Sequence, residues 1–135
     1  MSSERVREVG LVILRAGLGG MMVYHGWPKI LAGPAKWEHL GAAMAHLGVK
    51  FAPEAWGLAA ALAETVGGAL LVIGLLTRPA AGFLLFTMFV AANMHYRTEG
   101  LGEASHAVEL GIAFLSLLLM GPGPISLDAK WRGNA

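Results

Sequence analysis

The stretch Gly57–Leu76, GLAAALAETVGGALLVIGLL, decides the fold of this chain. It is about 20 residues long, which is the length of an α-helix that crosses a bilayer. It carries a single charged side chain, Glu64, and a lone carboxylate in hydrocarbon is costly unless another group pairs with it. Gly67 and Gly68 follow three and four residues later, so they share a helix face with Glu64. Another part of the chain must cover that face and pair with the carboxylate.

The composition indicates a membrane protein. Of the 135 residues, 56% are hydrophobic and 14% are charged, whereas soluble proteins have about 45–50% and about 25%. The net charge is +1 and no Lys/Arg cluster is present, so we expect no nucleic-acid partner. The chain has no cysteine, which excludes disulfides, thiolate metal sites, iron–sulfur clusters and CxxC redox chemistry carried by this chain.

Four apolar stretches predict an all-α integral membrane protein with one domain over residues 1–135. Proline and glycine punctuate the chain between them. The turns are short, so successive helices are antiparallel neighbours in a four-helix bundle. The predicted spans are Val9–Trp27, ended by Pro28, then Glu54–Leu76, Ala80–Tyr96 and Ala104–Met120.

The connection over residues 28–53 is the longest between two predicted spans. Its apolar residues recur at helical spacing with polar residues between them, which is typical of an amphipathic helix on a membrane surface or capping a bundle. These apolar residues are Trp37, Leu40, Met44 and Leu47. We therefore expect a short amphipathic helix between the first and second spans.

The first span carries a charge of its own, Arg15. At 1.5 Å per residue, Arg15 lies roughly 9 Å inside one boundary and Glu64 about 15 Å inside the other. A long arginine side chain could bridge the rest, so we predict a buried Arg15–Glu64 ion pair. Two interpretations stay open, a structural pair that fixes helix register and a ligand or proton site.

A second polar layer is predicted near the boundary opposite the termini. The antiparallel topology gives His25, His95, His106 and Glu109 similar depths, and His106 and Glu109 share a face because they are three residues apart. With Glu64, these residues are the candidate ligand or quinone site. Histidine and carboxylate can also bind metal, but no HExxH or compact metal motif is present, so the four are weak metal candidates. Ordinary interfacial histidines are the alternative.

Short motifs then recur in order along nearly the whole chain, and together they resemble the DoxX family of small bacterial and archaeal membrane proteins. They are R-x-x-L-G at 15–19, H-G-x-x-K at 25–29, A-E-x-x-G-G-x-L-L-x-x-G-L-L-T-R at 63–78, the acid Glu109, and G-P-G-x-x-S-L-D at 121–128.

The resemblance implies four helices in a bacterial inner membrane and a link to redox metabolism. The name-giving relatives are associated with a thiosulfate:quinone oxidoreductase, and other members with complexes that handle thiol or quinone stress. By position, Arg15, His25, Glu64 and Glu109 are the polar residues of the family pattern, and no catalytic residue is assigned by it.

A slight Lys/Arg excess on the side of the termini predicts that both are cytoplasmic. Arg15 interrupts the first span and no small-x-small site follows, so we expect an anchor that is not cleaved as a signal peptide.

Three functions follow from these observations. The first is a quinone-linked redox membrane protein, with quinone as the cofactor and with redox subunits or further copies of the chain as partners in the bilayer. The second is a non-catalytic accessory subunit of an electron-transfer complex. The third is a binder of a lipid or another small apolar ligand within the bundle.

Overall fold

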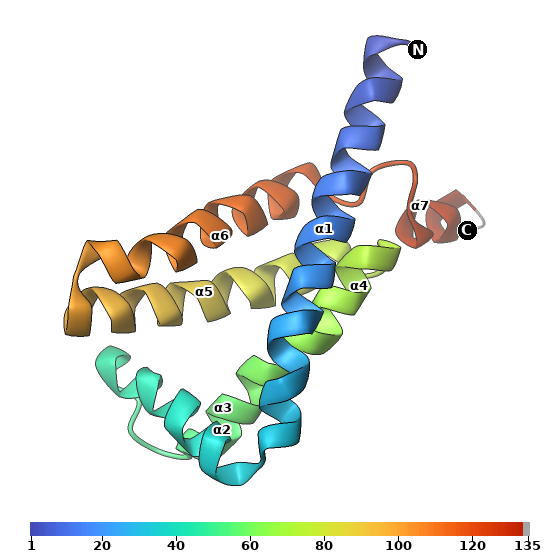
Figure 1. Cartoon of the computed structure of the whole chain (residues 1–135). Helices are drawn as coiled ribbons and strands as arrows, with labels where there is room; N and C mark the ends of the chain where they lie inside the picture. The colour runs from blue at the N-terminus through green and yellow to red at the C-terminus, as the bar shows by residue number, and fades with distance from the viewer. Residues whose placement is uncertain (134–135) are drawn as a thin grey trace.

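The computed structural model describes residues 1–133, and every regular element in this part is helical (Figure 1). The predicted all-α class is therefore confirmed. In chain order the elements are α1 Ser3–Ala32, α2 Pro34–Gly41, the 3-10 helix η1 Ala42–Leu47, α3 Pro53–Leu62, the π-helix η2 Ala63–Gly67, α4 Gly68–Ile73, α5 Thr77–Glu99, α6 Leu101–Met120 and α7 Leu127–Gly133.

Helix α1 contains the first predicted span and runs further than expected. It has 30 residues, which makes it about 45 Å long, and its N-terminal end projects beyond the other helices (Figure 1). The prediction that Pro28 ends it is wrong, because Pro28 lies within the helix and the break comes at Gly33, where φ is 89°. A proline near a helix end is tolerated where neighbouring elements satisfy the freed backbone groups.

Helices α3, η2 and α4 form one continuous rod that corresponds to the second predicted span. In the part that the structure describes, this rod, Pro53–Ile73, and helix α6 are the two helices long and apolar enough to cross a membrane. Helices α1 and α5 are of comparable length but carry more polar residues at their ends. The four-span bundle therefore remains a prediction.

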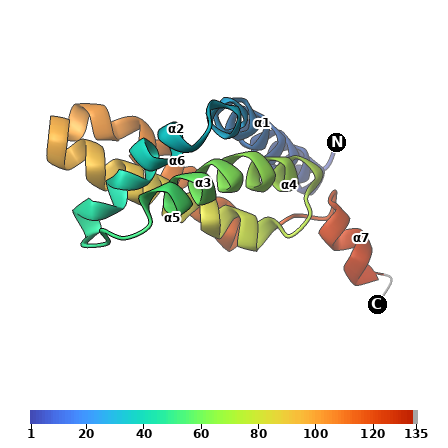
Figure 2. The same cartoon turned by 90° about the horizontal axis from the view of Figure 1, so that it is seen from below.

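The helices form two antiparallel pairs that diverge from a shared core. Helix α1 packs along the α3–η2–α4 rod, and α5 packs along α6. Figures 1 and 2 show the α5–α6 hairpin pointing away from the rod at one end. Where the pairs meet, the core residues include Met22, Leu71, Leu84, Phe114 and Leu117.

The amphipathic helix predicted in the long connection is present as α2 and η1. Helix α2 packs on α3, and Met44 of η1 is buried in a small second cluster with Ala43 and Val90 of α5. The connection therefore covers the space between α3 and α5 at the end of the molecule where the two helix pairs diverge.

The glycine face next to Glu64 is covered, as expected: α1 lies against Gly68, and Leu84 of α5 lies against Gly67. A Cβ added at Gly68 would lie 2.5 Å from the carbonyl oxygen of Gly19, and one added at Gly26 would lie 2.7 Å from the Cβ of Glu64. Backbones approach this closely only where side chains are absent, which is how small residues hold membrane helices together. This contact places the end of α1 beside Glu64.

We predict that Gly19→Ala destabilises the protein. The added Cβ would lie 3.0 Å from Leu71 Cβ and from Val72 N and would clash with the Gly68 carbonyl. Overpacking of this kind costs about 1–3 kcal/mol, measurable by thermal or denaturant unfolding in detergent. The adjacent Gly20→Ala is the matched control, because its Cβ would meet nothing within 4 Å. Equal unfolding of the two variants would show that this packing is absent.

Candidate functional site

Glu64 is buried and paired, but its partner is Lys29. The Lys29 Nζ donates to Glu64 Oε1 at 2.9 Å and to Oε2 at 2.8 Å. The Glu64 side chain is 5% exposed and that of Lys29 is 30% exposed. Lys29 lies in the last turn of α1, and the Gly26 contact brings that turn against the π-helix. The expectation of a buried, paired carboxylate is confirmed.

The predicted Arg15–Glu64 pair is wrong. Arg15 is 2% exposed, but its guanidinium donates to the main-chain oxygens of Pro122 and Ile125, the latter at 2.8 Å. It turns toward the end of the molecule that holds the termini, where carbonyls of the Gly-Pro-rich segment accept from its two terminal nitrogens. Lys29 approaches Glu64 from the opposite end of α1, so a second cation deep in the core is not required.

Arg15 belongs to a structural unit that we call the C-terminal clamp, made of Arg15, residues 74–77 and residues 121–128. The Asp128 carboxylate accepts from the N–H groups of Leu76 at 2.8 Å and Thr77 at 2.9 Å, capping the N-terminus of α5. The Asp128 N–H donates to the Gly74 oxygen at 2.9 Å. Three of the motifs that resemble the DoxX family therefore meet in one clamp, which ties the chain end to the core.

The electrostatics of Asp128 follow from this geometry. Burial by itself raises the pKa of the carboxyl group, but the N–H groups of Thr77 and Leu76 and the charge of Arg132 outweigh it. The net result is a pKa below the ordinary value for aspartate, because the charged form is the one that accepts these hydrogen bonds.

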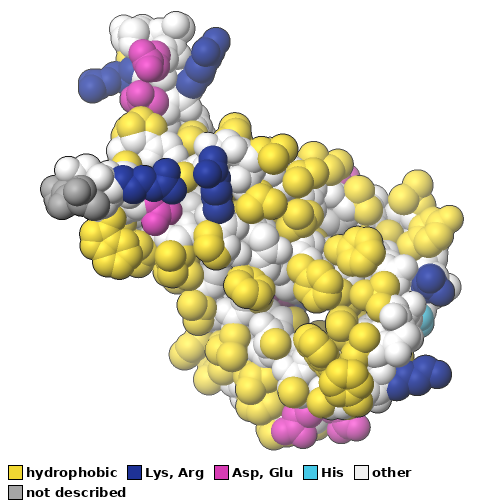
Figure 3. Space-filling model, turned by 180° about the vertical axis from the view of Figure 1, so that it is seen from behind, with side chains coloured by type: hydrophobic (Ala, Val, Ile, Leu, Met, Phe, Trp, Pro, Cys, Tyr) yellow, Lys and Arg dark blue, Asp and Glu magenta, His cyan; other side chains and the backbone are white. Residues whose placement is uncertain are grey.

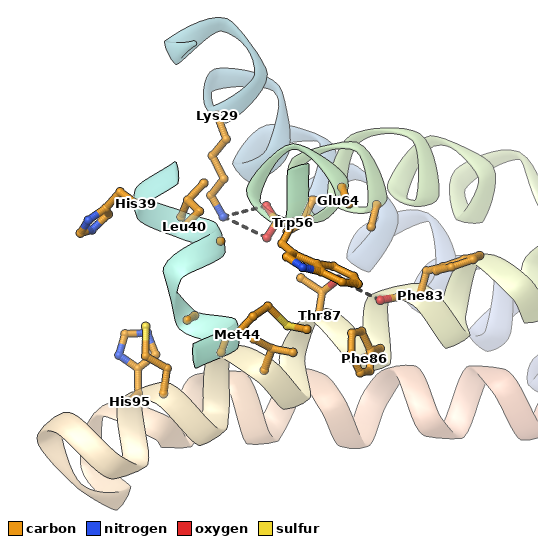
Figure 4. Close-up of a pocket in the computed structure, with 18 residues that line it drawn as sticks. Lys29, His39, Leu40, Met44, Trp56, Glu64, Phe83, Phe86, Thr87 and His95 are labelled. Atoms are coloured by element: carbon orange, nitrogen blue, oxygen red, sulfur yellow. Dashed lines mark hydrogen bonds and ion pairs between the residues drawn. The ribbon is translucent and has the colours of Figure 1, made fainter. Parts of the chain in front are cut away.

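A cavity of about 350 Å³ lies beside the Lys29–Glu64 pair, and we call it the pocket (Figure 4). Its walls follow helix periodicity. On α5 they repeat at helical spacing from Phe83 to His95, and on the rod they run from Trp56 through Ala59 and Ala60 of α3 to Ala63 of η2. Leu40 and Met44 close it from α2 and η1. The pocket is thus mostly apolar, and the ion pair forms part of its wall.

Three further polar side chains line the pocket. The Thr87 hydroxyl donates to the Phe83 carbonyl at 2.9 Å, so its oxygen keeps acceptor capacity toward the pocket. His95 Nδ1 lies 3.5 Å from Glu99 Oε2, and His39 of α2 is exposed at the rim. The Lys29 ammonium can therefore offer a donor to a ligand and the Thr87 oxygen an acceptor, while the Glu64 carboxylate is already bound by Lys29.

The pocket brings together part of the predicted site. Glu64 and His95 line it, whereas His25, His106 and Glu109 are exposed and lie outside it. Among residues 1–133 no group of three or more histidines and acids could hold a metal ion. The predicted layer of His25, His95, His106 and Glu109 is therefore not a cluster.

The rotation of each helix about its axis explains why these four residues do not meet. Equal depth does not fix which way a side chain points, and the inner face of α6 is taken by Ala104, Ala107 and Phe114. His106 and Glu109 consequently face outward.

Sequence reasoning also missed Lys29, although it stands in the H-G-x-x-K motif. It missed the pocket residues of α5 from Phe83 to His95 as well, although they recur at helical spacing.

The fold and the site define an all-α protein with many exposed hydrophobic side chains and a pocket beside the Lys29–Glu64 ion pair. Comparison with known proteins assigns its family. The DoxX family model matches residues 10–97, so the chain belongs to the DoxX family of membrane proteins. The inner membrane protein YphA of Escherichia coli K12 is 30% identical over 133 residues, covering 92% of this chain and 91% of that protein. No solved structure matches the chain.

We predict that Lys29→Met costs roughly 2–3 kcal/mol of stability, less than the cost for a fully buried pair because Lys29 is partly exposed. The loss arises because Glu64 would be left charged and unpaired in the core. Denaturant unfolding in detergent measures it, and a double-mutant cycle with Glu64→Gln should give strong coupling. The matched cycle of Arg15→Gln with Glu64→Gln should be additive; coupling there and not at Lys29 would contradict the assignment.

We also predict that Asp128→Ala costs about 1 kcal/mol at neutral pH, as the loss of a helix cap does. The pKa of Asp128 in the folded protein lies below the unfolded value of about 3.9. The charged carboxylate therefore stabilises the fold above that pH, and this stabilisation is lost as the pH falls through the folded pKa. The difference between wild type and variant should therefore shrink below about pH 4 in unfolding measurements. Glu38→Ala, an exposed acid on α2, should show neither effect, and a pH-independent loss at Asp128 would refute the charge's role.

Proposed function

We propose that this chain is a four-span protein of a bacterial inner membrane that binds the head group of a lipid-soluble quinone in the pocket and acts in redox metabolism beside a partner subunit. The observation that carries the proposal is the Lys29–Glu64 pair in the wall of a mostly apolar cavity. The proposal also requires that the helices cross the membrane, that the ligand fits the pocket and that a partner supplies electrons.

The surface supports four crossings. Hydrophobic side chains cover the middle of the face in Figure 3, and charged side chains gather at its two ends. Helices α1 and α5 expose large apolar residues such as Ile13, Phe83 and Phe89 along their lengths, as lipid-facing helices do. Both termini lie at the same end (Figure 1), and the slight Lys/Arg excess there favours a cytoplasmic location.

The pocket fits a quinone ring. Its volume of about 350 Å³ lies in the range of small-molecule sites, which are mostly apolar with a few placed polar groups. A lysine ammonium has three donors, two of which bind Glu64, and Lys29 is open enough to offer the third to an acceptor. A quinone carbonyl is an acceptor only, so it suits the remaining donor of Lys29.

Each residue would then have a physical role. Lys29 would hold one carbonyl oxygen, and Glu64 would keep Lys29 charged and oriented. Phe83, Phe86 and Met44 would pack on the ring and exclude water. A bound quinone would supply the capacity to accept electrons, and since this chain has no cysteine, the electrons would come from a partner oxidoreductase subunit.

A second candidate function is the binding of another apolar ligand without redox chemistry, in an accessory membrane subunit. The same alanine and phenylalanine walls favour it, because they contact only the apolar part of a ligand. The two candidates differ in the head group, so a comparison of a quinone with a hydrocarbon of similar size separates them.

We predict saturable binding of a ubiquinone analogue with a ten-carbon tail to the protein in lipid nanodiscs, and weaker binding of a hydrocarbon of similar size. Ala60→Leu fills the pocket wall and should lower the quinone affinity at least tenfold, as measured by tryptophan quenching. Ala69→Leu on α4 is the control, because Ala69 is exposed and lies outside the pocket. No saturable binding, or equal effects of the two leucines, would refute the proposal; equal hydrocarbon binding would favour the second candidate.

A further inference from the structure

Three phenylalanines stand on the outer surface of α5 at three-residue spacing. Phe83 is 67% exposed, Phe86 is 49% exposed and Phe89 is 56% exposed. Phe83 and Phe86 also line the pocket, whereas Phe89 does not. The wall of the pocket therefore reaches the surface of the molecule at the first two phenylalanines.

The opening at this place results from the divergence of α3 and α5. Helix α5 meets the rod at the π-helix, where a Cβ at Gly67 would lie 3.5 Å from Leu84 Cγ. Beyond that point α3 packs on α1 and α2, and α5 packs on α6 and η1. Ala59, an exposed pocket residue of α3, is the small side chain on the other edge. The edges of the opening thus hold Ala59, Phe83 and Phe86, all uncharged.

The roof of the pocket is fixed and does not offer an alternative entrance by lifting. Gly57 of α3 leaves no room for a Cβ against the backbone of Trp37 in α2, and Gly41 leaves none against Pro53. The Trp37 Nε1–H also donates to the Lys29 oxygen at 2.9 Å. Helix α2 is therefore held to both α1 and α3, and its exposed polar rim at His39 marks the water-facing end.

We infer that the pocket is loaded sideways from the bilayer, through a portal between α3 and α5 bordered by Ala59, Phe83 and Phe86. The inference rests on the proposed function and specifies its ligand, which is a head group on a long apolar tail. The head lies at Lys29 and Glu64, and the tail passes between the phenylalanines and remains among the lipid chains. Such a ligand never leaves the hydrocarbon, so it needs no path through water.

Cysteine labelling tests the portal, because the chain has no cysteine of its own. Single variants Phe86→Cys, Phe89→Cys and His39→Cys are folded into nanodiscs and then alkylated with a bulky maleimide. Stopped-flow tryptophan quenching gives the association rate of the ten-carbon-tailed ubiquinone analogue, whose ring is fully substituted and does not react with thiols. Each unlabelled variant is its own control, so a folding defect cannot be mistaken for a blocked portal.

The label at position 86 should slow association at least tenfold, while labels at positions 89 and 39 should change it less than twofold. Slowing by the label at 39 and not at 86 would overturn the portal and place the entrance at the water-facing end. Equal association rates for the proteins labelled at position 86 and at position 89 would also overturn the portal. If none of the unlabelled proteins binds the quinone, the proposed function fails first, and if they bind with no effect of position 86, only the portal fails.

Discussion

A carboxylate inside an apolar helix has to be neutralised, and the rest of this structure is arranged around how Lys29 does so. The pair can form only if the end of α1 lies against the π-helix, and this in turn requires Gly19, Gly26 and Gly68 at the contact. The π-helix at Ala63–Gly67 inserts an irregular turn at the same place, and irregular turns of this kind are frequent at functional sites. The charge pair, the helix contact and the pocket wall are consequently one feature.

Four polar residues of the DoxX pattern form two groups that contact different parts of α1, one at Arg15 in its middle and one at Lys29 in its last turn. Arg15 and Asp128 belong to the C-terminal clamp, where carbonyl groups accept from the two terminal nitrogens of Arg15 and N–H groups donate to Asp128. Lys29 and Glu64 belong to the pocket, where one member of the pair remains partly accessible. Groups whose partners are main-chain atoms of the clamp serve the fold, whereas a partly accessible ion pair in the wall of a pocket can also serve a ligand. This difference is our reason for placing the function at Lys29 and Glu64.

Much of the fold followed from the sequence. The apolar stretch around Glu64 predicted the rod, and the glycines after Glu64 predicted a close neighbour, which proved to be α1. The site was less predictable, because depth along a helix can be counted but rotation and bending cannot. Arg15 and Glu64 were predicted to meet since both lie in spans, yet Arg15 turns to the Pro122 and Ile125 carbonyls. The pocket itself depends on the angle between α3 and α5, which no local pattern encodes.

The identity of the Glu64 partner in a bilayer tests the account most directly. Magic-angle-spinning NMR of the protein in lipid, with ¹³C at glutamate side-chain carboxyls and ¹⁵N at lysine and arginine side chains, measures this contact by dipolar dephasing. The Glu64 signal is assigned by its loss in Glu64→Gln. The account predicts that lysine Nζ dephases the Glu64 carboxyl strongly, as the 2.8 Å contact requires. Dephasing of Glu64 by an arginine guanidinium, with none from lysine, would contradict it.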